Sequence, residues 1–188
     1  MTRLSIEAAR ADQAVRRVRA RLEDSVLDAS ERGETQREIA RQIDRSQPEV
    51  ARLISRARER RERRWLTAAE SAGLIASELR SGDEAFALRL VRSMLDTFRS
   101  LDEGARVLFL AERPSTGERR WDTLIRAALG WACREVAHPA PSWTQVRALE
   151  RLWFIRPERA LAGRLIQRTP TELAIVGIFI DAESLTGV

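Results

Sequence analysis

The stretch "TQREIARQIDRSQPEVARLIS", from Thr35 to Ser55, contains the same local pattern twice, eleven residues apart. Thr35 is followed three residues later by Glu38, and Ser46 is followed in the same way by Glu49. In each pair the hydroxyl oxygen can accept a hydrogen bond from a backbone amide of the first helical turn, while the carboxylate accepts one from the amide of the cap residue. The stretch therefore predicts two helices, the first of them about two turns long.

Each of these two helices carries an apolar stripe on one side, because a helical step of about 100° per residue brings its apolar residues together. The stripe residues are Ile39, Ala40 and Ile43 in the first helix and Val50, Leu53, Ile54 and Ala57 in the second. We expect the stripes to bury each other, with the small Ala40 allowing a close crossing. Pro48 agrees with a helix start, since proline is tolerated in the first turn.

This stretch resembles the DNA-binding helix-turn-helix of bacterial resolvases and repressors, over about 20 residues. The matching positions are Gln36, Ile39, Ala40, Ile43, Ser46, Val50 and Leu53. Two positions depart from the family pattern: Asp44 stands where glycine is usual, and Arg45 stands where an aliphatic residue is usual. Because aspartate tolerates a left-handed backbone better than most residues, we expect the turn to survive and Arg45 to point outward. The alternative is a helical hairpin that binds no nucleic acid.

The resemblance implies that the second helix enters the major groove with the side opposite its apolar stripe. Gln47 and Arg52 can form paired hydrogen bonds to adenine and guanine, so we expect them to read base edges. The predicted base-contacting residues are Gln47, Pro48, Ala51, Arg52 and Ser55. The predicted phosphate-contacting residues, which set affinity and register, are Thr35, Gln36, Arg37, Arg45, Ser46 and Arg56.

The net charge of +5 is concentrated in one short segment. All 33 basic residues are arginines, and lysine, asparagine and tyrosine are absent, a bias that a GC-rich genome explains. Basicity alone is therefore weak support for nucleic-acid binding. Residues 45–64, however, contain eight arginines and three acids, whereas the segments before and after them are balanced. The run "RARERRERRW" is either a self-paired, solvated helical face or an additional contact with the DNA backbone.

The residues before this stretch predict a long helix with a coiled-coil period. Apolar or small residues recur in alternating steps of four and three, with Ser25 filling one place. These seam positions are Leu4, Ala8, Ala11, Val15, Val18, Leu22 and Ala29. The part from Asp12 would cover the core of the two short helices and end at Gly33. The turns before Asp12 need another partner, either the later part of the chain or a second subunit, and the alanine-rich seam alone would be a weak dimer interface.

Residues 65–188 are predicted to be helical almost throughout. We expect long helices over 66–82, 83–101 and 119–137, and shorter ones over 144–154, 157–169 and part of 170–188; "IVGIFI" is the one candidate strand. The expected inward residues are Ala87, Leu90, Val91, Met94, Leu95, Phe98, Trp121, Leu124, Ile125 and Ala128, with Ala132 or Cys133. The fold class is therefore all-α: a helix-turn-helix module over 1–64, followed by a helical domain for partner binding or dimerisation over 65–188.

Several function classes are not supported by the sequence. It contains no phosphate-binding loop, nucleophile elbow or zinc-protease motif, and Asp83 and Asp122 are typical of first helical turns, so we expect no enzyme. Cys133 and His138 are each the only residue of their kind, which leaves no internal disulfide and no Cys/His zinc site, and no cofactor is expected. Without an apolar run of about 18 residues or a secretory signal, we expect a cytoplasmic protein with no membrane partner.

The last 80 or so residues are similar to a group of actinobacterial-type proteins associated with toxin-antitoxin operons. The similar segments are "LAERPSTGERRWDTLIRAAL", "APSWTQ", "LERLWF" and "TPTELAIVGIFIDAESL". The similarity implies an antitoxin that represses its own promoter and binds a cognate toxin, but it assigns no individual residue to that contact. Trp143 and Trp153 are either interface anchors or core residues.

Together these features predict a sequence-specific DNA-binding transcriptional regulator, the autorepressing antitoxin of a toxin-antitoxin operon. Its expected partners are a double-stranded operator, a cognate toxin and a second copy of the chain. Two alternatives remain. One is an effector-sensing transcription factor with a small-molecule pocket in the helical domain, and the other is a helical interaction adaptor without DNA binding.

Overall fold

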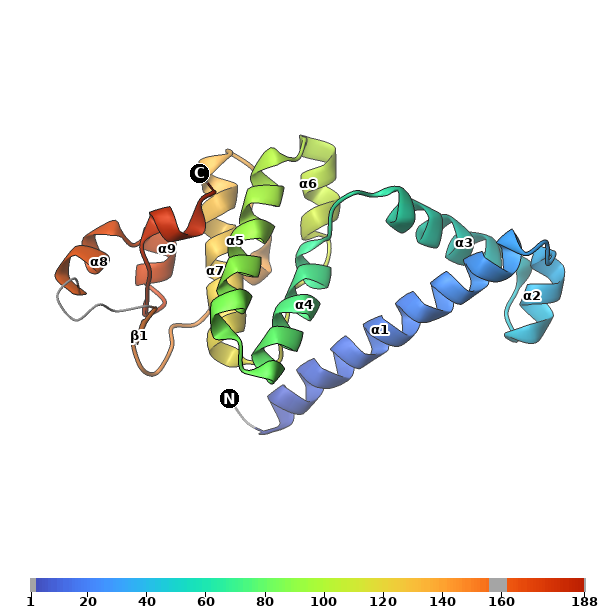
Figure 1. Cartoon of the computed structure of the whole chain (residues 1–188), viewed down its shortest axis with the longest axis horizontal. Coiled ribbons are helices and arrows are strands. Elements are labelled where there is room, and N and C mark those ends of the chain that lie inside the picture. Colours follow the sequence, from blue (N-terminus) through green and yellow to red (C-terminus); the bar gives the residue numbers. More distant parts are fainter. Residues whose placement is uncertain (1–2, 156–161, 188) are drawn as a thin grey trace. The chain divides into compact units, whose positions relative to one another are not determined.

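The computed structural model describes residues 3–155 and 162–187 of the chain, which are mostly helical with one short two-stranded sheet (Figure 1). The prediction of a mostly helical chain is confirmed. Contacts within the chain divide it into two compact units. One unit comprises Arg10–Trp65, and the other comprises Leu66–Val188 and the first residues of the chain. The division between 65 and 66 lies one residue from the predicted boundary, but the start of the chain is grouped with the later unit.

The unit Arg10–Trp65 contains α2 (Gln36–Gln42), α3 (Gln47–Glu62) and most of α1 (Arg3–Glu31). Both predicted capping boxes are present. The amide of Thr35 donates to Glu38 Oε2 at 2.8 Å, and the Thr35 hydroxyl accepts from the amide of Glu38 at 3.3 Å. Ser46 and Glu49 form the same pair of bonds at 2.9 and 3.4 Å. The two helix starts are therefore where the spacing of hydroxyl and carboxylate predicts them.

A tight turn links α2 to α3. Asp44 adopts the left-handed conformation with φ 52°, and the amide of Arg45 donates back to the carbonyl of Ala40 at 2.9 Å. This bond satisfies one of the carbonyls that a helix end otherwise leaves free. The end of α1 is built the same way, with Gly33 at φ 95° and the amide of Glu34 bonded to the carbonyl of Ala29. The prediction that aspartate serves this turn in place of glycine is confirmed.

A single apolar core holds the three helices together. It contains all seven predicted stripe residues, of which Ile43 and Leu53 are partly buried. Helix α1 contributes Leu22, Val26, Leu27 and Ala29 to the same core. The buried residues of α1 differ here from the predicted seam: Ser25, a seam position, is exposed, whereas Val26 and Leu27 are buried. This end of α1 covers two helices at once, so it needs a wider apolar face than a coiled-coil seam provides.

The unit beginning at Leu66 is built around four longer helices, α4 (Ala68–Ser81), α5 (Glu84–Ser100), α6 (Glu103–Leu110) and α7 (Arg119–Glu135). Helix α4 packs on α5 and α6, and α5 packs on α7. Gly82 ends α4 with φ 85°, and Asp83 caps α5 by accepting from the amide of Phe86 at 2.7 Å. The predicted inward residues are buried except Leu90, which is half-buried, and both Ala132 and Cys133 are buried.

The segment predicted as a helix over 144–154 is not helical. After a 3₁₀ turn, η1 (Ser142–Thr144), the chain runs extended to β1 (Trp153–Phe154), which pairs in parallel with β2 (Ile178–Phe179). The amides of Leu149, Trp153 and Ile155 donate to the carbonyls of Val176, Gly177 and Phe179. These long-range bonds outweigh the local helix propensity of the segment. The short elements α8 (Ala162–Arg168), α9 (Thr171–Ala174) and η2 (Ala182–Leu185) complete the described chain.

Helix α7 is buried on nearly every side and includes a buried charged pair. Asp122 was expected to be an ordinary first-turn acid, but it is only 8% exposed. One of its carboxylate oxygens accepts from the amide and the hydroxyl of Thr116, and the other accepts from Ser115 and Arg126. Arg126 in turn donates twice to the carbonyl of Pro114. The pair therefore fastens the loop before α7 to the helix.

Asp122→Asn should lower the free energy of unfolding by about 3 kcal/mol, because it removes a buried carboxylate charge that pairs with the guanidinium of Arg126 and holds the loop before α7. The measurement is urea denaturation of the full chain. Glu118→Gln is the matched control, since Glu118 is exposed and makes no side-chain cap hydrogen bond, and its effect should stay within about 0.5 kcal/mol. Equal effects of the two substitutions would contradict this role of Asp122.

Candidate nucleic-acid interface

The side of α3 opposite its buried stripe is open to solvent. Gln47, Pro48, Arg52 and Ser55 are exposed, and Ala51 is half-buried. The buried stripe holds Val50, Ile54 and Ala57 against the other two helices, so the polar side has to face outward. The structure therefore brings the five predicted base-contacting residues onto one accessible side of one helix.

The predicted phosphate-contacting residues lie around the two helix starts and along α3. Thr35, Arg37, Arg45, Ser46 and Arg56 are exposed, and Gln36 is half-buried. The two hydroxyl residues are already engaged, because Thr35 and Ser46 each donate to the carboxylate of their own capping box at 2.7 Å. This engagement leaves the arginines as the groups best able to take a phosphate.

The two capping carboxylates remain charged near the helix starts. The hydroxyl and the amide of Thr35 donate to Glu38 and hold its pKa below the ordinary value of 4.5. The amide and the hydroxyl of Ser46 act in the same way on Glu49, and the nearby Arg45 and Arg52 lower its pKa further. These anions repel phosphate at the helix N-termini, so Arg45 and Arg52 both compensate Glu49 and supply the positive charge of this surface.

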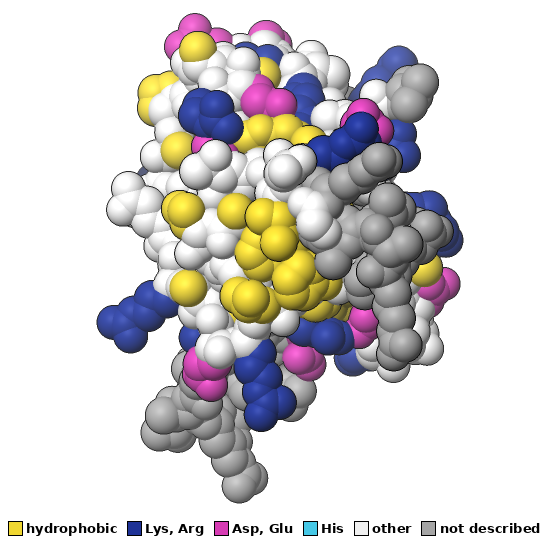
Figure 2. Space-filling model, turned by 90° about the vertical axis from the view of Figure 1, so that its left-hand side faces the viewer, with side chains coloured by type: hydrophobic (Ala, Val, Ile, Leu, Met, Phe, Trp, Pro, Cys, Tyr) yellow, Lys and Arg dark blue, Asp and Glu magenta, His cyan; other side chains and the backbone are white. Residues whose placement is uncertain are grey.

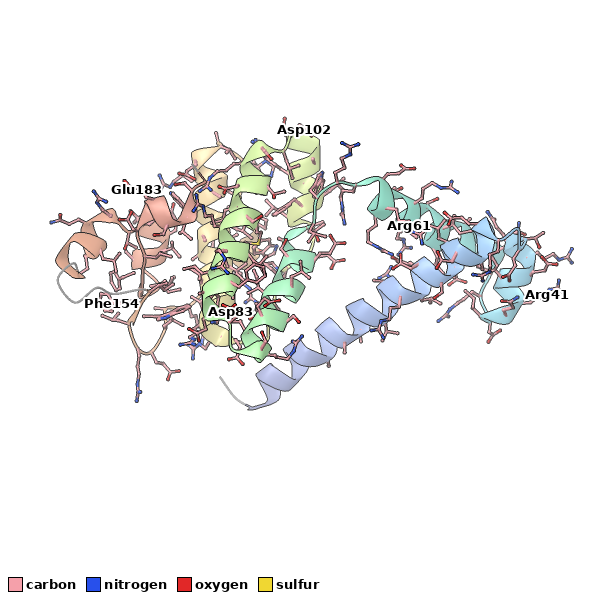
Figure 3. The ribbon with its side chains drawn as sticks, viewed as in Figure 1. Arg41, Arg61, Asp83, Asp102, Phe154 and Glu183 are labelled. Atoms are coloured by element: carbon pink, nitrogen blue, oxygen red, sulfur yellow. The ribbon has the colours of Figure 1, made fainter. Side chains whose placement is uncertain are left out.

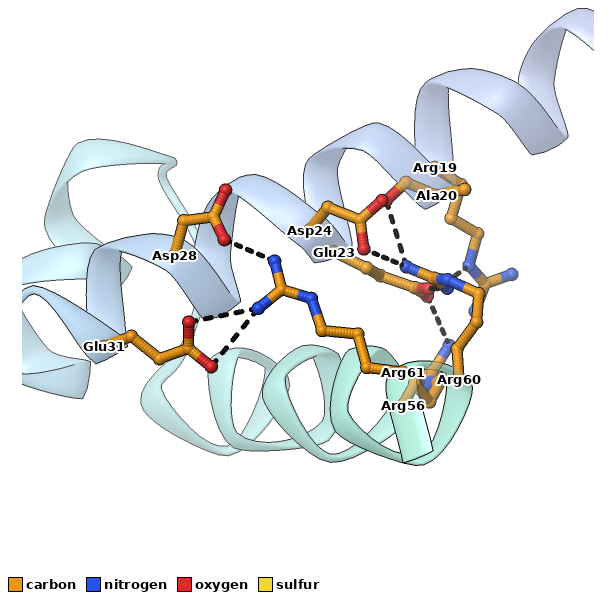
Figure 4. A network of polar contacts seen from close by, with 9 residues as sticks. All are labelled: Arg19, Ala20, Glu23, Asp24, Asp28, Glu31, Arg56, Arg60 and Arg61. Carbon is orange, nitrogen blue, oxygen red and sulfur yellow. Dashed lines mark hydrogen bonds and ion pairs between the residues drawn. The ribbon is translucent and has the colours of Figure 1, made fainter. Parts of the chain in front are cut away.

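A network of ion pairs joins the second half of α3 to α1 (Figure 4). At its centre is Glu23 of α1, whose side chain is only 6% exposed. Arg60 donates to Glu23 at 2.5 Å, to Asp24 at 2.7 Å and to the carbonyl of Ala20 at 3.2 Å. Burial alone would lower the pKa of Arg60, but the hydrogen bonds to the two carboxylates outweigh it and raise that pKa. Arg60 is therefore a structural cation.

Two further arginines of α3 take part in this network. Arg61 bonds to Asp28 and to Glu31, and these hydrogen bonds raise the pKa of its guanidinium. Arg56 lies 3.8 Å from Glu23, a longer and weaker ion pair, and its side chain is 43% exposed. We refer to Glu23, Asp24, Asp28 and Glu31, together with the three arginines Arg56, Arg60 and Arg61, as the α1–α3 clamp.

The clamp divides the positive charge of residues 45–64 into two groups. Within the described part of the chain, Arg45, Arg52, Arg58 and Arg64 of this segment are exposed and form no ion pair. Arg37 and Arg41 of α2, outside the segment, are likewise exposed and form no ion pair with a described residue. Figure 3 shows the contrast between Arg41, on the exposed surface of α2, and Arg61, on α3 beside α1. Sequence inspection placed the excess charge correctly but not this division, because the acids of α1 are about 30 residues away in the chain.

Other kinds of site find less support. Among the described residues, no three His, Cys, Asp or Glu side chains are grouped as metal ligands. No helix in the described ranges is both long and apolar enough to span a bilayer. Trp143 and Trp153 are half-buried, and Trp153 packs edge-on against Trp121 with ring centroids 5.3 Å apart.

Comparisons of the chain with protein-family models, with curated proteins and with solved structures found no match.

Glu23→Gln should loosen the contact between α1 and α3, because it removes the buried charge that Arg60 and Arg56 share. We expect the free energy of local opening to fall by about 2 kcal/mol, measured by native-state hydrogen exchange of the α1 and α3 amides. Asp24→Asn is the control, since Asp24 is 46% exposed and should contribute less than about 1 kcal/mol. Unchanged exchange in Glu23→Gln would rule out the clamp as a stabilising contact.

Proposed function

We propose that the protein is a sequence-specific DNA-binding regulator that uses α2, the turn at Asp44 and α3 as a helix-turn-helix. The observation that carries this proposal is the open side of α3, where Gln47 and Arg52 are exposed opposite the buried stripe. A helix of this width fits the major groove of duplex DNA. The resemblance of Thr35–Ser55 to resolvase and repressor modules supports the same function.

In this proposal the exposed residues have two different roles. Gln47 and Arg52 form hydrogen bonds to base edges and so determine which sequence is bound. Arg37 and Arg45 contact phosphates, which determines affinity and its dependence on salt. The clamp arginines Arg60 and Arg61 contribute little, because the carboxylates of α1 already balance their charge. Arg56, which is 43% exposed and lies 3.8 Å from Glu23, adds a third phosphate contact. A symmetric dimer would read two half-sites about 34 Å apart.

Three arginine-to-alanine substitutions separate these roles. Arg52→Ala should cost about 1–3 kcal/mol of binding to the operator and little of binding to random DNA. Arg45→Ala should weaken both and reduce the slope of affinity against salt concentration by about 1. Arg61→Ala is the control and should change neither much, because Arg61 is neutralised by Asp28 and Glu31. Fluorescence anisotropy with fragments of the protein's own upstream region, over a salt series, measures all three.

The proposal fails if no upstream fragment is preferred over random duplex DNA. The assignment of roles fails if Arg52→Ala and Arg45→Ala affect specific and random DNA equally. If Arg61→Ala lowered the affinity for DNA as much as Arg45→Ala, Arg61 would be available to DNA despite its ion pairs with α1.

We also propose that the unit beginning at Leu66 binds a partner protein through an apolar surface on β1 and β2. The parallel register places Leu152 and Phe154 beside Gly177 and Phe179 on one face of the pair. Phe154 and Phe179 stack at 4.7 Å, and Leu152 is 64% exposed. The other face, with Trp153 and Ile178, is directed inward, where Ile178 is fully buried.

Figure 2 shows apolar side chains gathered on the side of this unit that carries β1, α8 and α9. Ile175, at the end of α9, is 70% exposed and lies two residues before Gly177 in the chain, so we include it in the proposed surface. Arg147 and Arg151 are exposed nearby in the chain and form no ion pair with any described residue. An exposed apolar surface beside unpaired arginines suits a partner with apolar and acidic side chains.

A partner-binding surface on one unit and a DNA-binding surface on the other correspond to the arrangement of an antitoxin that represses its own operon. The similarity of the last 80 or so residues to proteins of toxin-antitoxin operons supports this assignment. In that role the surface on β1 and β2 would contact the toxin, and α3 would contact the operator. An effector-sensing regulator would instead need a ligand pocket in the later unit.

Leu152→Glu combined with Ile175→Glu should abolish co-purification of the chain with the product of the neighbouring reading frame. A charged side chain buried in such an interface costs several kcal/mol, whereas operator binding through α3 should be unaffected. Leu74→Glu is the control, because Leu74 is 48% exposed on α4 and lies outside the proposed surface. Retention of the complex in the double variant, or its loss in Leu74→Glu, would refute this surface.

A further inference from the structure

The side of α3 that lies opposite the core ends in two exposed carboxylates. The residues on this side, all of them exposed, follow one another in steps of four and three and are Pro48, Arg52, Ser55, Glu59 and Glu62. Such steps keep side chains on one side of a helix, because they nearly match its repeat of 3.6 residues. The row therefore starts among the residues proposed to contact bases and finishes with acids only.

Neither of these two acids holds the fold together. Residues 45–64 contain three acids, and one of them, Glu49, completes the capping box at the start of α3. Within the described ranges, Glu59 and Glu62 form no ion pair and no side-chain hydrogen bond. The clamp arginines pair instead with the acids of α1, on another side of the helix (Figure 4). Glu59 and Glu62 therefore present their carboxylates to solvent.

Two arginines flank the row. Arg56 and Arg58 are both exposed and lie about 80° to either side of the centre of the row, at a helical step of about 100° per residue. Arg56 has only a long ion pair, and Arg58 has none with a described residue. Positive charge on both flanks attracts phosphates of any sequence. Glu59 and Glu62 lie between these flanks, where their charge opposes that attraction.

The two acids are too far along α3 to face the bases that its start would read. Glu59 and Glu62 come 12 and 15 residues after Gln47, about 18 and 22 Å along the helix axis. A helix-turn-helix contacts base edges with the N-terminal residues of its second helix. Because a helix is straight whereas the groove winds around the duplex, the far end of α3 would approach phosphates instead. A carboxylate in that position is repelled.

We propose that Glu59 and Glu62 are specificity-determining residues, which repel phosphates and so keep the last turns of α3 off the duplex. The inference rests on the proposed function. On the operator, contacts between bases and the start of α3 hold the protein, and its far end can tilt away at little cost. On random DNA only phosphate contacts remain, and α3 can gain more of them only by bringing both acids against the backbone. The repulsion therefore weakens the wrong complex more than the right one.

The test is fluorescence anisotropy of the full chain, with the preferred upstream fragment and with random duplex DNA over a salt series. Glu59→Gln combined with Glu62→Gln should tighten binding to random DNA at least about fivefold at low salt and binding to the preferred fragment less than about twofold. The preference for the operator should fall accordingly. For random DNA the slope of affinity against salt concentration should steepen by about 1, because the freed end of α3 gains phosphate contacts.

Glu103→Gln combined with Glu118→Gln is the matched control. Both residues are exposed, both lie in the other unit, and their replacement changes the net charge by the same amount. This pair should change the affinity for random DNA less than about twofold, since the effect depends on the position of the acids and not on total charge. Equal tightening in the two double variants would overturn the proposal. Thermal melting by circular dichroism verifies that both stay folded.

Two further results would overturn the inference while leaving the proposed function intact. One is an operator preference that Glu59→Gln combined with Glu62→Gln leaves unchanged. The other is weaker binding of this variant to the operator together with a changed base preference, which would mean that the acids accept hydrogen bonds from bases, as from the amino group of cytosine. A wild-type chain that prefers no upstream fragment over random DNA would refute the proposed function itself, and the inference with it.

Discussion

The turn between α2 and α3 is the constraint on which the proposed DNA-binding surface depends. With only Ile43 to Ser46 between the helices, the left-handed Asp44 and the bond from the Arg45 amide to Ala40 end α2 abruptly. The capping box at Ser46 then starts α3 at once. Two helices joined this closely cannot lie in line, so their apolar stripes meet α1 in one core and the polar side of α3 remains outside.

Through the α1–α3 clamp, the arginine-rich segment also holds α3 against α1. A helix with this many arginines would repel itself and would bind any polyanion, which opposes sequence discrimination. The acids of α1 neutralise Arg60 and Arg61 in the last turns of α3 and stabilise the packing of the two helices. Arg45 and Arg52 keep their charge at the part of α3 that also carries Gln47, and, within the described part of the chain, Arg58 and Arg64 are exposed and unpaired further along. Neutralising Arg60 and Arg61 would lower the charge available for non-specific contact with DNA.

Local sequence signals were sufficient to predict the helices of the unit Arg10–Trp65 and the start of α5. Helix starts depend on side chains within three residues of the cap, so Thr35, Ser46 and Asp83 could be recognised from the sequence. The buried stripes of α2 and α3 likewise follow from helical spacing. The helix predicted over 144–154 was wrong because the competing partner of that segment, β2, lies about 25 residues later. Asp122 was misread for the same reason, since its partners in the preceding loop give no local pattern.

The sequence by itself therefore determined the mostly helical fold, the positions of the caps and turns, and the segment that carries the excess charge, because each depends on near neighbours along the chain. Only the tertiary structure decided which arginines are neutralised by α1, which of the described acids of α3 stay unpaired, and which face of β1 and β2 stays open. Ion pairing and burial depend on distances between side chains that are remote in sequence, and the packing of whole helices and strands sets those distances.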